Sequence, residues 1–156
     1  ALGFNYRLTD VFAAVGLEQL KRLEEWTAAR RANAARLDSM LAGVAGITTP
    51  TVAAHGEHVY HLYTIRLDRS RFSCTRDEFA AALAAEGCGY AVHYPRPLTR
   101  QPVFLNDLGI ICPPLPVAEQ LAEEVLSLPV HPMLTDTQVS QVAEAVRKVA
   151  DAYRIN

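Results

Sequence analysis

Residues 59–67 read VYHLYTIRL and carry the clearest β-strand pattern in the chain. The stretch is rich in β-branched and aromatic residues, which fit a pleated, half-buried surface. Because side chains alternate between the two faces of a strand, counting in steps of two groups a set of five on one face. These residues are Val59, His61, Tyr63, Ile65 and Leu67.

The segments around this strand alternate between helical and strand-like patterns. Thr75 with Glu78 and Thr135 with Gln138 have the spacing of capping boxes, and Pro116 suits the first turn of a helix. Further short strands are predicted within residues 47–50, 88–94 and 128–130. Strands in ones and twos, separated by helices, predict an α+β fold in which helices cover one face of a small, mainly antiparallel sheet.

A long helical region is predicted near the start of the chain. Thr9 or Asp10 can cap its first turn, and Gly43 and Gly46 end it. Residues 11–17 are apolar all round, and a helix without a polar face must be covered on every side. We therefore expect this stretch to pack against something outside the small domain.

Composition excludes several classes of function. Half of the 156 residues are hydrophobic, and the net charge is -2, with no basic stripe that would neutralise nucleic-acid phosphates. No apolar run of about 18 residues predicts a membrane span. The three cysteines, Cys74, Cys88 and Cys112, form neither a disulfide framework nor a metal pattern, so we expect a cytoplasmic protein.

Two groups of reactive side chains are better interpreted as structural residues than as a metal site or a catalytic pair. His55, His58 and His61 are spaced by three, but a strand that begins near Val59 puts only alternate residues on one face, and no carboxylate or thiol completes a metal site. Cys88 and His93 are an odd number of residues apart on one short strand, so they point to opposite faces. Neither group predicts catalysis.

Four segments, in order, resemble landmarks of the nucleotide-sugar aminotransferases of the DegT/StrS family. They are GFNYRLTDVFAAVGLEQLKRLEEW (3–26), EHVYHLYTIRL (57–67), GYAVHYPRPLTRQPVF (89–104) and PVAEQLAEEVLSLPVHPMLTDTQVSQV (116–142). The family consists of fold-type I dimers that use pyridoxal phosphate to move an amino group, typically from glutamate, onto a keto-sugar nucleotide. Residues 1–42 would be the active-site loop and interdomain helix, and residues 43–156 the small C-terminal domain.

The resemblance also implies roles for individual residues. Asn5 would cross the dimer to hydrogen-bond the cofactor phosphate of the other subunit, and Arg7 could add charge-assisted contacts. His93, Tyr94 and Arg96 would border the sugar-nucleotide pocket, although a histidine at a strand end could equally bind the backbone. Many members have a second histidine where Thr99 stands, so Arg96 and Arg100 are candidate diphosphate contacts or solvated charges.

The cofactor's Schiff-base lysine is expected in a large domain that this chain lacks. Lys21 and Lys148 both fall within amphipathic helices, and neither is a credible substitute. The chain begins at Ala1, which suggests an excerpt or a processed form. Two alternatives stay open at this point: a sugar dehydratase on the same scaffold, or a non-catalytic dimerisation module.

Overall fold

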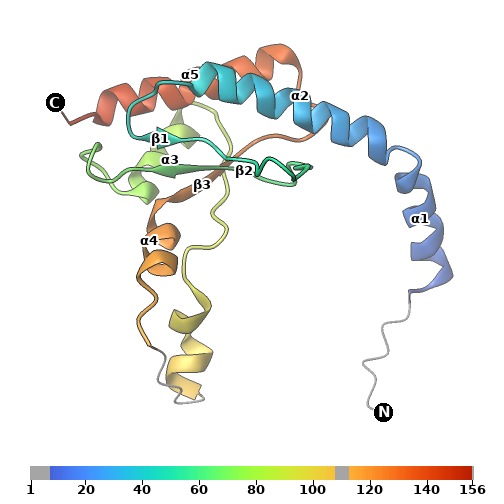
Figure 1. Ribbon diagram of the computed structural model, residues 1–156, viewed down its shortest axis with the longest axis horizontal. Coiled ribbons are helices and arrows are strands. Elements are labelled where there is room, and N and C mark those ends of the chain that lie inside the picture. Colours follow the sequence, from blue (N-terminus) through green and yellow to red (C-terminus); the bar gives the residue numbers. More distant parts are fainter. Residues whose placement is uncertain (1–7, 108–112, 156) are drawn as a thin grey trace.

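The computed structural model describes residues 8–107 and 113–155. The elements are α1 (Asp10–Leu20), α2 (Leu23–Leu41), β1 (Ile47–Thr48), β2 (Tyr63–Leu67), α3 (Arg76–Ala85), a 3-10 turn (Leu98–Arg100), a π-helical turn (Val103–Asp107), α4 (Pro116–Glu124), β3 (Val125–Leu128) and α5 (Asp136–Tyr153). The fold is α+β, as predicted: a small antiparallel sheet with helices packed on it (Figure 1).

The sheet has the strand order β1-β2-β3, with β2 in the centre and both pairings antiparallel. Tyr63, Ile65 and Leu67 are buried on one face of β2, which confirms three of the five residues predicted for that face. Val59 and His61 lie before the strand and are exposed. The strand starts late because Tyr60 has a φ of 48°, which is incompatible with extended pairing.

β1 (Ile47–Thr48) lies within the predicted strand at residues 47–50, whereas the other two predicted strands differ from the structure. β3 begins at Val125, directly where α4 ends, and it stops at Leu128 because Pro129 has no N–H to extend the ladder. Residues 88–94 form no strand. Their only ladder contact within the described part of the chain is a bridge between Ala91 and Ser127, on the outer edge of β3.

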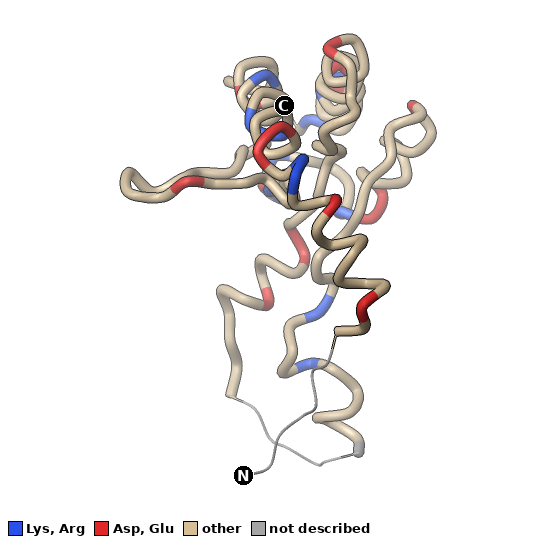
Figure 2. The backbone as a smooth tube through the Cα atoms, turned by 90° about the vertical axis from the view of Figure 1, so that its right-hand side faces the viewer, with Lys and Arg blue, Asp and Glu red and all other residues tan. Residues whose placement is uncertain are grey.

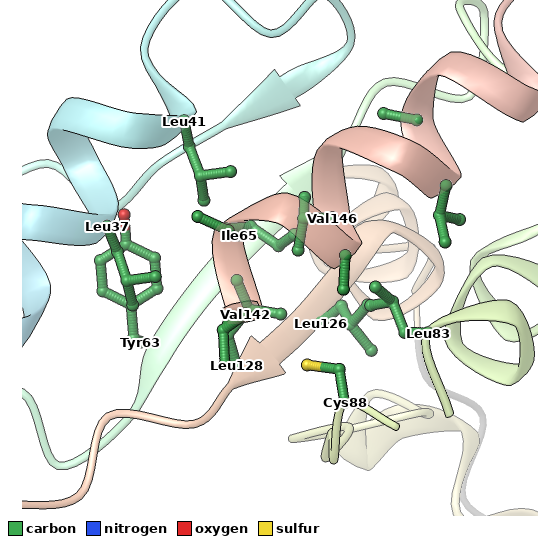
Figure 3. Packing of buried hydrophobic residues seen from close by; sticks show 14 of the residues in the cluster. Leu37, Leu41, Tyr63, Ile65, Leu83, Cys88, Leu126, Leu128, Val142 and Val146 are labelled. Carbon is green, nitrogen blue, oxygen red and sulfur yellow. The ribbon is translucent and has the colours of Figure 1, made fainter. Parts of the chain in front are cut away.

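The core lies between the sheet and helices α2, α3 and α5. The valines of α5 recur at steps of three and four and form one buried stripe, consisting of Val139, Val142, Val146 and Val149. Figure 3 shows side chains of α2, the sheet and α5 meeting in this layer. The same cluster includes Leu37 and Leu41 of α2, Phe79 and Leu83 of α3, and Leu126 and Leu128 of β3.

Local capping signals are confirmed at three helix starts. Thr75 and Thr135 each form the complete reciprocal capping box with the residue three positions later. Thr9 Oγ1 accepts a hydrogen bond from the Phe12 N–H at 3.4 Å. These bonds satisfy N–H groups that have no partner inside the helix.

The predicted single N-terminal helix is two helices. The break lies at Lys21 and Arg22, where no glycine or proline marks it. The Arg22 backbone leaves the helical region (φ -103°, ψ 0°), and its guanidinium lies 4.8 Å from the ring centroid of Trp26. In Figure 1, α1 extends away from the sheet, and the structure buries none of its residues.

Charges of both signs are spread along the helices rather than gathered in one stripe (Figure 2). Across residues 8–107 and 113–155, no helix combines the length and the apolar character needed to cross a membrane.

Candidate functional site

A cavity of about 910 Å³ lies between α4 and the segment that leads from Val92 into the 3-10 turn. Three of the predicted site residues, His93, Tyr94 and Arg96, line this cavity together. Other lining residues on the same wall are Pro97, Leu98, Thr99 and Gln101. The opposite wall is apolar and consists of Leu115, Ala118, Leu121, Ala122 and Val125.

The first wall is attached to the edge of the sheet. Ala91 donates to the Ser127 carbonyl at 3.0 Å, and Ser127 donates back to the Ala91 carbonyl at 2.8 Å. This pair of bonds fixes where the segment leaves β3, two residues before His93. Prolines at 95 and 97 then favour extended backbone and prevent a helix from forming before the 3-10 turn.

His93 and Tyr94 present two different ring surfaces at the cavity. Their ring centroids are 5.8 Å apart with the planes at 90°, and the peptide bond between them is cis. Tyr94 is 73% exposed, so its ring has little protein cover and is available to a ligand. An imidazole and a phenol can both donate and accept hydrogen bonds, which suits recognition of sugar hydroxyls.

The two arginines of this wall differ in their partners. Arg100 binds Glu119 of α4, with Nε and Nη2 at 3.0 and 2.9 Å from Oε1. Arg96 lines the cavity, and no carboxylate of the described residues forms an ion pair with it. Of the two candidate diphosphate contacts, Arg96 is therefore the one whose charge is available to an anion.

Thr99 is a further polar residue on the wall that carries His93 and Arg96. Its Oγ1 is buried, and among the described residues no group hydrogen-bonds to it. A buried hydroxyl without a partner costs roughly 1–3 kcal/mol. Thr99 thus supplies an unused hydrogen-bonding group close to His93 and Arg96.

Sequence reasoning missed the apolar wall. A spacing of four residues puts Val117, Leu121 and Val125 on one face, but Val117 is 69% exposed and does not line the cavity. The true face follows positions 118, 121, 122 and 125, whose spacing of three and four is visible in the sequence. That spacing indicates an amphipathic helix but not what the helix faces.

The predicted cofactor residues Asn5 and Arg7, and Tyr6 between them, lie outside the described residues. Neither Lys21 nor Lys148 lines the cavity. Both are exposed, and each forms a surface ion pair, Lys21 with Glu18 and Lys148 with Glu86, with 2.6 Å between nitrogen and oxygen. The described residues therefore do not fit the covalent anchor of pyridoxal phosphate.

Cys88 is buried in the core and does not line the cavity. Burial raises the pKa of its thiol, so the sulfur is protonated and unreactive at neutral pH. His93 faces the cavity instead, so the two side chains do not form a nucleophile–base pair.

Residues 1–147 match the model of the DegT/DnrJ/EryC1/StrS aminotransferase family. The chain is 39% identical to the dTDP-3-amino-3,4,6-trideoxy-alpha-D-glucose transaminase of Streptomyces venezuelae over 152 residues, 96% of this chain and 38% of the relative. It is 37% identical to the UDP-2-acetamido-2-deoxy-3-oxo-D-glucuronate aminotransferase of Pseudomonas aeruginosa over 145 residues, 93% of this chain and 37% of the relative. The chain thus spans less than two fifths of these proteins.

A solved structure agrees with these matches. The crystal structure of Streptomyces venezuelae DesV, in complex with a ketimine intermediate, superposes with a TM-score of 0.86 and 38% sequence identity. The superposition covers 100% of this chain and 40% of that one. The similarity in fold therefore extends over the length of this chain.

Proposed function

Because the chain belongs to the DegT/DnrJ/EryC1/StrS aminotransferase family, we propose that it is the C-terminal part of an enzyme that transfers an amino group onto a keto-sugar nucleotide. Pyridoxal phosphate would be the cofactor and glutamate the amino donor. Residues 1–42 would form the active-site loop and the interdomain helix, and residues 43–156 the small domain. The single observation that carries the substrate assignment is the cavity that joins His93, Tyr94 and Arg96.

The cavity suits a ligand that is polar and anionic at one end. The Arg96 guanidinium can pair with a diphosphate through parallel N–H donors. His93 and Tyr94 can hydrogen-bond hydroxyls of the sugar, and the Tyr94 ring offers a flat apolar surface. The wall formed by Ala118, Leu121 and Val125 excludes water from the opposite side of the ligand.

The cofactor would be bound mainly by residues outside the described part of the chain. When bound, it would act as the electron sink for amino transfer. We propose that Asn5 and Arg7 donate hydrogen bonds to its phosphate, with Asn5 reaching the cofactor of the partner subunit. This arrangement requires a homodimer, and we propose the cytoplasm as its location. The names of the two relatives, both aminotransferases, support this activity.

The test of this function uses the full-length protein with keto-sugar nucleotides and glutamate. We expect amino transfer, and we expect His93→Ala to raise the KM for the nucleotide sugar by about tenfold while the KM for glutamate changes less than about twofold. His55→Ala is the matched control, because His55 is exposed and lies outside the cavity. Equal effects on both substrates would show that His93 has only a structural role.

A further inference from the structure

Helix α4 separates two hollows of the surface. One side of the helix, with Ala118, Leu121 and Ala122, lines the proposed substrate cavity. The opposite side carries Gln120, Glu123 and Glu124, which line a second hollow next to Arg69 and Phe72. A buried side chain that holds α4 from outside the cavity therefore also sets the position of the cavity's apolar wall.

The C-terminal end of α4 is held by a buried arginine from another helix. Arg76 of α3 is only 7% exposed, and its Nη1 donates to the carbonyls of Ala122 at 3.0 Å and Val125 at 3.1 Å. The last carbonyls of a helix have no donors within that helix, so Arg76 supplies the missing donor. Both residues that it contacts line the cavity.

A second buried charge fastens the same junction to the sheet. Glu124 is 6% exposed, and its Oε2 accepts from Nη2 and Nε of Arg66 on β2, at 2.7 and 3.2 Å. Its Oε1 accepts from Gln120 Nε2 at 2.6 Å, so both carboxylate oxygens are bound. Because an uncompensated buried charge is costly, this geometry tolerates little movement.

We propose that Arg76 and Glu124 are positioning residues for nucleotide-sugar binding, which act through the α4–β3 junction without touching the substrate. They hold the apolar wall at a fixed distance from His93 and Arg96. Loss of either one lets the wall move, which weakens binding of a large ligand that contacts both walls. A small amino donor does not depend on this wall. The substrate named here rests on the proposed function.

The variants Arg76→Gln and Glu124→Gln in the full-length protein test the proposal. Each is expected to raise the KM for the nucleotide sugar at least about fivefold and to leave the KM for glutamate within about twofold. Amide hydrogen exchange of residues 116–128 in the unliganded protein should accelerate in both variants. Arg76→Lys, which keeps a donor and the charge, should restore part of the binding.

Arg69→Gln is the matched control. Arg69 pairs with Glu123 on the same side of α4, but both side chains are at least half exposed, and exposed pairs contribute little. The Arg69→Gln variant should change neither of the two KM values nor the amide hydrogen exchange of residues 116–128. If Arg76→Gln fails to fold, Glu124→Gln and Arg76→Lys decide the question.

Unchanged exchange at residues 116–128, or equal increases in the two KM values, would overturn the positioning role. If the wild-type protein converts no nucleotide sugar, the proposed function fails. The exchange experiment then still decides whether Arg76 and Glu124 hold the wall.

Discussion

Asn5 is the residue on which the proposed contact with the cofactor depends. A neutral amide donor binds a phosphate without a titratable charge, whereas a carboxylate in its place repels the phosphate. We expect Asn5→Ala to weaken retention of pyridoxal phosphate by the proposed full-length dimer about tenfold, and Asn5→Asp to weaken it further. Equilibrium dialysis measures the affinity, and sedimentation checks that the dimer is intact. Equal affinity in wild type and both variants would remove Asn5 from the phosphate site.

Tyr63 links the centre of the sheet to α2. Its hydroxyl donates to Asp38 Oδ1 at 2.6 Å, and the ring is fully buried. Burial, and then the hydrogen bond to Asp38, raise the pKa of Tyr63 above its ordinary value. The folded state therefore keeps this proton at a pH where the unfolded chain loses it. This contribution to stability is complete below about pH 10 and declines as the pH rises above that value.

Tyr63→Phe should lower the free energy of unfolding by about 1–2 kcal/mol at neutral pH, because a hydrogen bond to a charged group is lost. It should also flatten the decline in stability above about pH 10. Urea unfolding of the full-length protein at neutral and alkaline pH measures both effects. Tyr90→Phe, at an exposed tyrosine, is the control and should alter neither. If stability declined as steeply above about pH 10 in Tyr63→Phe as in the wild type, Tyr63 would not be the cause of that decline.

At the scale of elements, the start of α5 depends on one threonine. Thr135 Oγ1 accepts from the Gln138 N–H at 3.2 Å, and the Gln138 side chain accepts from the Thr135 N–H at 2.9 Å. Thr135→Ala should therefore destabilise the protein by about 1 kcal/mol in urea unfolding. Thr137→Ala is the matched control, since Thr137 is exposed in the same turn and does not cap it. Equal stability of the two variants would show that this capping box contributes nothing.

The capping boxes could be predicted because each depends on residues three positions apart. The start of β3 could not, since Val125 pairs with Arg66, which is far away in the sequence. Dependence on distant pairing partners also explains why the strand predicted at residues 88–94 does not form. Among the described residues of this segment, only Ala91 pairs with a strand, because the free edge of β3 is short and ends before Pro129.

The sequence predicted the residues of only one wall of the cavity. The segment with His93 and Arg96 stood out by its residue types and its prolines, whereas the α4 wall consists of alanine, leucine and valine at ordinary helical spacing. Nothing in such a pattern distinguishes a wall that faces a ligand from one that faces a core. The break between α1 and α2 was likewise unmarked, because no glycine or proline lies at residues 21 and 22.

At the scale of the whole molecule, α1 exposes an apolar surface that the described chain does not cover. Val11 is 73% exposed, Phe12 66% and Leu17 63%. Exposed apolar surface of this kind favours association. We expect residues 1–156, expressed alone, to self-associate in sedimentation velocity, and Phe12→Glu to weaken that association at least about tenfold.

Val117→Glu is the control for this association, because Val117 is an exposed valine on α4, outside the α1 surface. It should leave the association unchanged. A chain that stays monomeric at every concentration would show that α1 does not drive assembly. Equal weakening by both substitutions would place the contact elsewhere.

The direct passage from α4 into β3 restricts how the length of this gene can change. No loop separates Glu124 from Val125, and the pairing of β3 with β2 is fixed from Val125 to Leu128. A single codon inserted there would turn Leu126 and Leu128 to the opposite face of the sheet or rotate α4 by about 100°. Insertions and deletions should therefore disrupt the fold between residues 116 and 128. They should be tolerated between residues 49 and 59, which lie in the segment without regular structure between β1 and β2.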